Sequence, residues 1–190
     1  MSESIQRWLW RVALVTGLAL VAASVLVGQW APVRAGFAGS YASSRAAPCL
    51  PGRAVSTMDS PHISWRDAGR VRYDSNPPTS GPHFAFTITT GIYPDPVPDG
   101  LLVHALEHGH VEILYAPDTP RPTVRDLESI ARGHADEVVL APYPHLPRGI
   151  AVTAWGRIET LDTLDAGRID EFVRALAGRY DHGWTRPDPC

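Results

Sequence analysis

Residues 12 to 33 form a run of 22 residues without a charged side chain. As a helix rising about 1.5 Å per residue, this run matches a bilayer hydrocarbon core of about 30 Å. Positive charges precede the run and tryptophans mark both ends, as in a cytoplasmic flank and interfacial aromatic belts. These residues are Arg7, Arg11, Trp8, Trp10 and Trp30. We therefore expect a cytoplasmic tail over residues 1–11 and a transmembrane anchor over residues 12–33.

A cleaved signal peptide is the alternative for this segment, because Val33-Arg34-Ala35 has the small-residue spacing of a processing site. Both alternatives deliver the rest of the chain to the extracytoplasmic side. The anchor predicts a single-pass protein of the cell membrane, whose membrane contact is this helix. Residues 34–50, rich in Ala, Gly and Ser, predict a flexible linker. Residues 51–190 predict one extracytoplasmic domain of about 140 residues, which is large enough to bury a core.

The chain has two cysteines, Cys49 near the start of this domain and Cys190 at the last position. An oxidising compartment allows a disulfide that joins the two ends of the domain. Two free thiols are the alternative, because closure requires α-carbons within about 7 Å of each other. Both cysteines lie far from the histidines in sequence, and we do not expect them to be metal ligands.

The charged residues exclude several functions. The formal net charge is −3, and all 17 basic residues are arginines. No basic patch offers itself to phosphates, so we expect no nucleic-acid partner. A chain without lysine forms no lysine Schiff base and no phosphate-binding P-loop of the usual kind.

The chain predicts short elements joined by long ordered loops. Its 18 prolines and 16 glycines are frequent over residues 76–100 and 117–149, which disfavours a helical bundle. Apolar spacing predicts helices over residues 101–108 and 123–132 and a last helix opened by Asp165, whose apolar stripe is Ile169, Phe172, Val173 and Leu176. Strands are predicted over residues 71–73, 111–115, 138–141 and 150–160. In the second of these strands, Val111, Ile113 and Tyr115 should face the core. This mixed order predicts an α+β fold, a small mixed sheet with packed helices.

Three histidines and a glutamate are concentrated in residues 104–110. On a helix, His104 and His108 are one turn apart on one face, and Glu107 lies beside them. His83 ends the rigid segment Asn76-Pro-Pro-Thr-Ser-Gly-Pro-His83 and can present another ring to the same place. Neutral imidazoles suit copper or zinc, with the glutamate as a ligand or as a hydrogen-bond acceptor for a ligand. We predict a transition-metal site made by His83, His104, His108 and Glu107.

Weaker donors lie nearby in the sequence. His110 follows the helix break at Gly109, and Met58 and His62 lie upstream as extra soft or nitrogen donors if the metal is copper.

Two alternatives remain open for the same residues. The pattern His104-Ala-Leu-Glu107-His108 matches the H-x-x-E-H signature of inverted zinc peptidases, in which the glutamate is the general base. A glycine follows the pattern at once, whereas those enzymes need a long helix. The second alternative is a structural or protein-interaction module in which the polar side chains brace a proline-rich loop and bind no metal.

Several long motifs resemble a bacterial membrane-anchored family catalogued as domain of unknown function 3105. They are Tyr73-Asp-Ser-Asn-Pro-Pro-Thr-Ser-Gly-Pro-His83, Gly91-Ile-Tyr93, Pro96-Val-Pro98, Leu102-Val-His-Ala-Leu-Glu-His-Gly109 and Ala154-Trp-Gly156. The resemblance covers residues 65–180 approximately and implies an exported, membrane-tethered bacterial domain without a settled activity. The residues that carry the family pattern are His83, His104, Glu107 and His108, whereas residue type varies at the position of His110.

Overall fold

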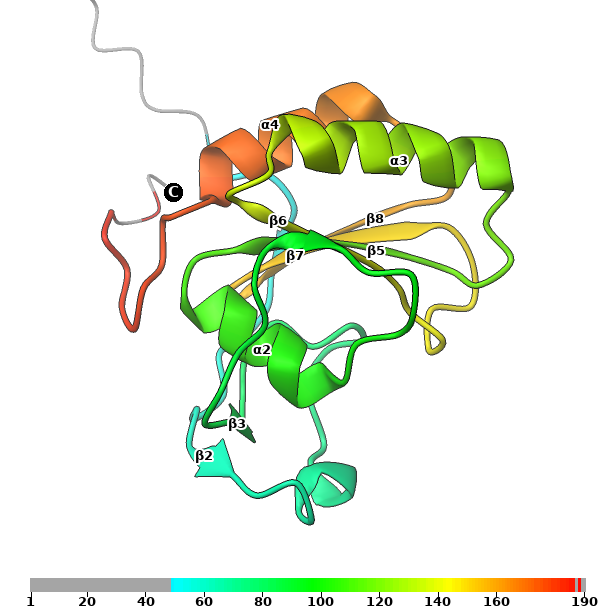
Figure 1. The fold of residues 1–190 in the computed structure, drawn as a ribbon. Helices are drawn as coiled ribbons and strands as arrows, with labels where there is room; N and C mark the ends of the chain where they lie inside the picture. The colour runs from blue at the N-terminus through cyan, green and yellow to red at the C-terminus, as the bar shows by residue number, and fades with distance from the viewer. Residues whose placement is uncertain (1–48, 187, 189–190) are drawn as a thin grey trace, which may run out of the picture. The chain divides into compact units, whose positions relative to one another are not determined.

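The computed structural model describes residues 49–186 and residue 188 (Figure 1). A six-stranded mixed sheet has the order β1-β8-β7-β5-β6-β4. Its strands are β1 (Arg53–Ala54), β4 (Gly91–Ile92), β5 (Val111–Tyr115), β6 (Val138–Pro142), β7 (Ile150–Ala154) and β8 (Arg157–Leu161). β4 and β5 each pair with β6 in parallel, and the β5–β7, β7–β8 and β8–β1 pairs are antiparallel. The predicted α+β fold with a small mixed sheet is confirmed.

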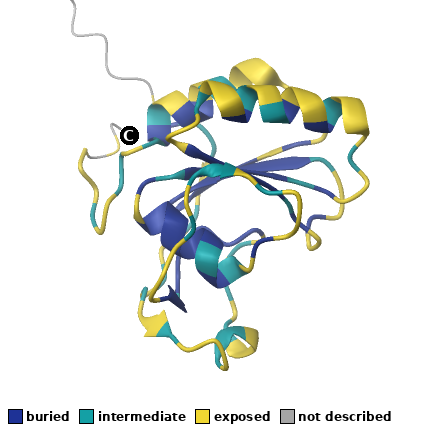
Figure 2. Ribbon diagram, in the orientation of Figure 1, coloured by how far each residue is buried: buried dark blue, intermediate teal, exposed yellow. Residues whose placement is uncertain are grey.

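Helices cover both faces of the sheet (Figure 1). α3 (Arg121–Gly133) and α4 (Ala166–Leu176) lie together on one face, and α2 (Asp99–Glu107) lies on the other. The dark blue central strands in Figure 2 are buried between these layers. The core beneath α3 and α4 includes Leu127, Val111, Ile113 and the predicted α4 stripe Ile169, Phe172, Val173 and Leu176. The core beneath α2 includes Leu102, Ala105, Leu114, Val139 and Ala151.

Two helix ends follow from local chemistry. The Asp165 carboxylate accepts a hydrogen bond from the backbone N–H of Arg168 and caps α4, as predicted. α2 ends before Gly109, whose φ of +83° belongs to the left-handed region that terminates helices. Asp99 is the first residue of α2. Its carboxylate accepts a hydrogen bond of 3.0 Å from the Tyr143 hydroxyl.

Three strand predictions need correction. Residues 150–160 form a hairpin of β7 and β8 because the chain turns at Gly156, where φ is +66°. Residues 71–73 form no strand, and Val71 instead ends the short 3₁₀ helix η1 (Ala68–Arg70). β5 is buried on both faces, so Glu112 lies in the core beneath α2 with 0 % exposure.

A second, two-stranded sheet lies beside α2, on the side away from the main sheet (Figure 1). It pairs β2 (His62–Ile63) with β3 (His83–Phe84) in parallel. The register sets His62 opposite His83. The proline-rich loop before β3 is buried from Pro77 to Gly81, and the backbone N–H of Met58 donates to the Ser80 hydroxyl in it. This sheet and loop hold His83 in place beside α2.

The predicted cytoplasmic tail, the anchor over residues 12–33 and almost all of the linker lie outside the described residues. Within residues 49–186, no helix has the length and apolar character needed to cross a membrane. Cys190 is also outside the described residues, so its pairing with Cys49 stays a prediction. The contacts divide the chain after Ala47 into two units, of which the second contains all the elements above.

Candidate metal centre

Four side chains bring potential metal ligands together at the junction of α2 with the two-stranded sheet. They are His62, His83, His104 and Glu107, and one ligand atom from each lies within 4.8 Å of all the others. The last three are buried, and His62 is exposed. A tetrahedral ion with ligands at 2.0–2.1 Å holds its donor atoms about 3.3 Å apart. The four ligand atoms would therefore have to move inward to bind one ion.

The four potential ligands come in two pairs, one placed by the pairing of β2 with β3 and the other by α2. The parallel register of β2 and β3 sets His62 beside His83, with ring centroids 5.0 Å apart. His104 and Glu107 project from neighbouring turns of α2, three residues apart. Gly100 lets α2 approach β3, since a β-carbon at this position would lie 2.8 Å from the Phe84 ring. The rings of His83 and His104 are consequently 4.7 Å apart.

Two backbone carbonyls set the tautomers of the buried histidines. Nδ1 of His83 lies 2.9 Å from the carbonyl oxygen of Gly81, and Nδ1 of His104 lies 2.6 Å from that of Phe84. Because a carbonyl only accepts hydrogen bonds, each Nδ1 carries the proton. In the neutral ring, Nε2 then carries a lone pair, which in His104 faces Nε2 of His108 at 3.0 Å. The contact of Nδ1–H with a carbonyl is the outer-shell arrangement that orients metal-binding histidines in proteins.

The buried Glu107 carboxylate faces one of these lone pairs. Its Oε2 lies 3.1 Å from Nε2 of His83, and its Oε1 accepts a hydrogen bond of 2.7 Å from the Ser60 hydroxyl. His83 Nε2 is buried and makes no hydrogen bond of good geometry within the described part of the chain. A lone pair and a carboxylate oxygen repel each other unless a cation or a proton lies between them. The contact is therefore compatible either with a histidine–glutamate ion pair or with a metal ion between the two groups.

The surroundings of His104 favour its neutral form. Burial lowers the pKa of His104 from its ordinary value, and the hydrogen bond to the Phe84 carbonyl partly opposes this effect. The neighbouring rings of His83 and His108 lower the pKa further. A neutral imidazole is the form that binds a metal ion.

His108, the fourth predicted ligand, lies at the edge of the cluster. Its Nε2 is 3.0 Å from Nε2 of His104, and its side chain is 37 % exposed. It also belongs to a neighbouring group of potential ligands with Asp181 and His182. The structure thus brings together His83, His104 and Glu107 as predicted and places His108 at the boundary between the two groups.

Sequence reasoning named His62 only as a weaker donor and did not find His182. The β2–β3 pairing that places His62 has no local signal, because each strand is two residues long. His182 reaches the site from the C-terminal segment, with Nδ1 3.4 Å from Oε2 of Glu107. His110 is in neither group of potential ligands, and burial lowers its pKa.

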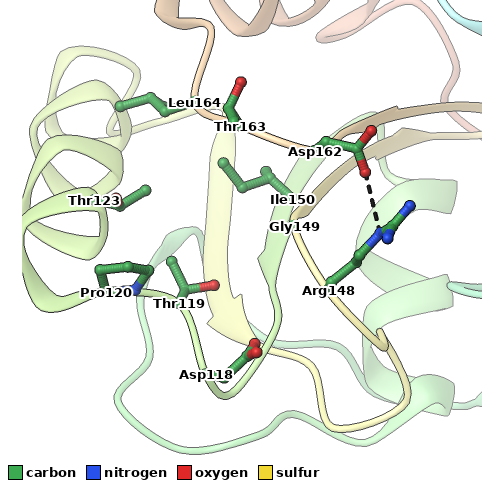
Figure 3. A pocket seen from close by; sticks show the side chains of 10 residues that line it. All are labelled: Asp118, Thr119, Pro120, Thr123, Arg148, Gly149, Ile150, Asp162, Thr163 and Leu164. Carbon is green, nitrogen blue, oxygen red and sulfur yellow. Dashed lines mark ion pairs between the residues drawn. The ribbon is translucent and has the colours of Figure 1, made fainter.

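A pocket of about 330 Å³ opens elsewhere, between the start of α3, the loop before β7 and the loop after β8 (Figure 3). Arg148 and Asp162 form an ion pair at its rim, 3.3 Å apart. None of the candidate metal ligands lines this pocket, and we assign no chemistry to it.

The model of the family described as "Protein of unknown function (DUF3105)" matches residues 64–187. The chain belongs to this family. The DUF3105 match includes His83, His104, Glu107, His108 and His182, whereas His62 lies just before it. No curated protein and no solved structure matches the chain. Membership in DUF3105 therefore supplies no activity, and function must be argued from the site.

Proposed function

We propose that the domain binds one transition-metal ion, copper or zinc, through His62, His83, His104 and Glu107, and that it serves in metal handling. The observation that carries the proposal is the pair of Nδ1–H groups held by the carbonyls of Gly81 and Phe84. With Nδ1 protonated, Nε2 is the donor atom that each ring can offer, and it faces Glu107 in His83 and His108 in His104. Three imidazoles and one carboxylate form a ligand set that suits Zn²⁺ or Cu²⁺.

Glu107 acts in this proposal as a ligand and not as a general base. Its Oε1 accepts a hydrogen bond from the Ser60 hydroxyl, and its Oε2 is directed at nitrogens of His83 and His182, which belong to the two groups of potential ligands. A general base needs an oxygen directed at a water molecule or a substrate. A carboxylate directed at other potential ligands favours metal binding without hydrolysis over the inverted-zinc-peptidase alternative.

The proposal also includes a location, in which the domain is tethered to the membrane. Residues 12–33 anchor the chain, and the domain stands on the extracytoplasmic side, where it would meet metal ions outside the cytoplasm. Protease treatment of intact spheroplasts that express the chain tests this orientation. The domain should be digested without lysis, and its protection until lysis would contradict the proposed location.

Metal binding is tested with the full chain, purified in mild detergent with any affinity tag removed. Zn²⁺ and Cu²⁺ affinities are measured by competition with a chromophoric chelator for wild type, His83→Gln and His104→Gln. His145→Gln is the matched control, because His145 is exposed and outside both groups of potential ligands. Each ligand substitution should weaken binding by more than the roughly 10- to 100-fold caused by loss of an outer-shell partner.

The control should bind as wild type does, and circular dichroism should show the same secondary structure in all samples. Negligible metal binding by wild type and by every variant would overturn the proposal. It would favour the alternative in which the same side chains form a structural or protein-interaction module without metal.

A further inference from the structure

We propose a second cation site, formed by His108, Asp181 and His182 beside the first site, for a divalent transition-metal ion. The three residues lie where the end of α2 meets the C-terminal segment. One ligand atom from each lies within 4.8 Å of the others, and all three side chains are exposed. The second site rests on the proposed function only through Glu107, which contacts a residue of each group. The three proposed ligands of the second site lie outside the first group.

The separations within this group suit an ion better than direct hydrogen bonds. Asp181 Oδ1 lies 3.6 Å from Nδ1 of His108 and 3.9 Å from Nε2 of His182. Both distances exceed the 2.7–3.2 Å of N–H···O hydrogen bonds. They are a few tenths of an ångström above the approximate 3.3 Å between two ligands of one tetrahedral ion. The His108 and His182 rings are nearly perpendicular, with centroids 4.7 Å apart, so both can present a nitrogen to the carboxylate.

The C-terminal segment that carries these ligands is held in a defined shape. The backbone N–H of His182 donates to the carbonyl of Glu107 at 3.2 Å, and that of Asp181 donates to the carbonyl of Gly183 at 3.0 Å. Tyr180 stacks on the buried Trp155 with ring centroids 4.6 Å apart. His182 has a φ of +50°, a left-handed conformation that histidine adopts more readily than most residues. The two ligands thus belong to a built turn against α2.

Glu107 connects the two sites. Its Oε2 lies 3.1 Å from Nε2 of His83 in the first group and 3.4 Å from Nδ1 of His182 in the second. The contact with Nδ1 of His182 leaves Nε2 of that ring, which faces Asp181, for the proposed ion, so Glu107 orients His182 as a ligand and does not bridge the two ions. The first site is mostly buried and the second open to solvent. An ion at the second site would therefore exchange with solvent more readily than an ion at the first.

The stoichiometry of Zn²⁺ binding tests this proposal in the tag-free full chain. Equilibrium dialysis measures zinc per chain for wild type, Asp181→Asn and His182→Asn. The Asn substitution at position 182 tolerates the left-handed backbone and removes the imidazole, and His145→Asn is the control. We expect two ions in wild type and the control, and one ion in the other two variants.

The outcomes separate the two proposals. One ion in wild type, unchanged in Asp181→Asn and His182→Asn, would overturn the second site and leave the proposed function standing. No bound zinc in any sample would overturn both. As a further measurement, wild type loaded with two equivalents of Cu²⁺ should give the electron paramagnetic resonance spectrum of two interacting ions. The His182→Asn variant should give that of an isolated ion, and isolated-ion spectra in both would also contradict the second site.

Discussion

Gly109 lies directly against the backbone of Tyr180: a β-carbon at position 109 would stand 2.5 Å from the Tyr180 carbonyl oxygen. The backbone N–H of Gly178 donates to the Gly109 carbonyl at 2.9 Å in the same contact. The glycine that ends α2 therefore also admits the C-terminal segment to the candidate metal centre. Its two roles, a φ of +83° and a close backbone approach, both exclude a side chain.

Gly109→Ala should destabilise the domain by about 1–3 kcal/mol, because alanine resists the left-handed conformation and its methyl group collides with Tyr180. Urea unfolding followed by circular dichroism measures the change. Gly133→Ala is the control, since a β-carbon there meets no atom within 4 Å and φ is not left-handed. Equal stability of the two variants would show that the segment does not pack on Gly109.

Glu107→Gln should lower the affinity for Zn²⁺ by at least about tenfold, because the amide keeps the shape of the carboxylate but not its charge. Competition with a chromophoric chelator measures the affinity. Glu128→Gln, at a glutamate paired with Arg132 on α3, is the control. Full metal affinity together with loss of a hydrolytic activity would instead identify Glu107 as a general base.

The buried Glu112 should make stability depend on pH. Burial raises its pKa to about 8, against a weaker opposing hydrogen bond from Thr153. The folded state therefore keeps the proton longer than the unfolded chain does, and the stabilisation present below pH 4.5 is lost as pH rises to about 8. The slope is at most about 1.4 kcal/mol per pH unit.

Urea titrations of wild type and Glu112→Gln between pH 5 and pH 9, two bounds chosen roughly to bracket the raised pKa, check this dependence. The variant should lack the contribution of Glu112 to the slope, whatever its absolute stability. Parallel curves for the two proteins would mean that Glu112 titrates alike in the folded and unfolded states.

We predict that Cys49 and Cys190 form a disulfide if the domain is exported. Peptide mapping without reduction should recover the two cysteines in one linked fragment. Cys190→Ser should then cost about 2–4 kcal/mol of stability, as loss of a disulfide does in other proteins. Complete alkylation of both thiols in protein purified from the exported fraction would contradict the pairing.

The sequence predicted those parts of the fold that depend on local chemistry. The Asp165 cap, the apolar stripe of α4 and the helix end at Gly109 rest on residues within a few positions of each other. The hairpin of β7 and β8 was predicted as one strand, because Trp155 and Gly156 interrupt an otherwise continuous apolar pattern only briefly. The burial of Glu112 was missed because α2 covers a face of β5 that alternation assigned to solvent.

In the candidate site too, only the residues placed by local sequence were predictable. His104 and Glu107 share a helix, so their spacing alone places them together. His83 depended on a rigid loop whose direction the sequence indicates only in part. His62 and His182 come from segments that reach the site through long-range pairing, β2 with β3 and the C-terminal turn with α2. Tertiary contacts of this kind carry no periodic signal in the sequence.

The two-residue pairing of β2 with β3 has a consequence for the release of a bound ion. His62 is held by a short peripheral ladder, whereas His104 and Glu107 belong to a helix packed on the main sheet. Short exposed elements open at much lower free energy than a buried core. If the proposed site binds an ion, the ion would leave when β2 separates from β3 while the rest of the domain stays folded, so metal loss and unfolding would be separate events.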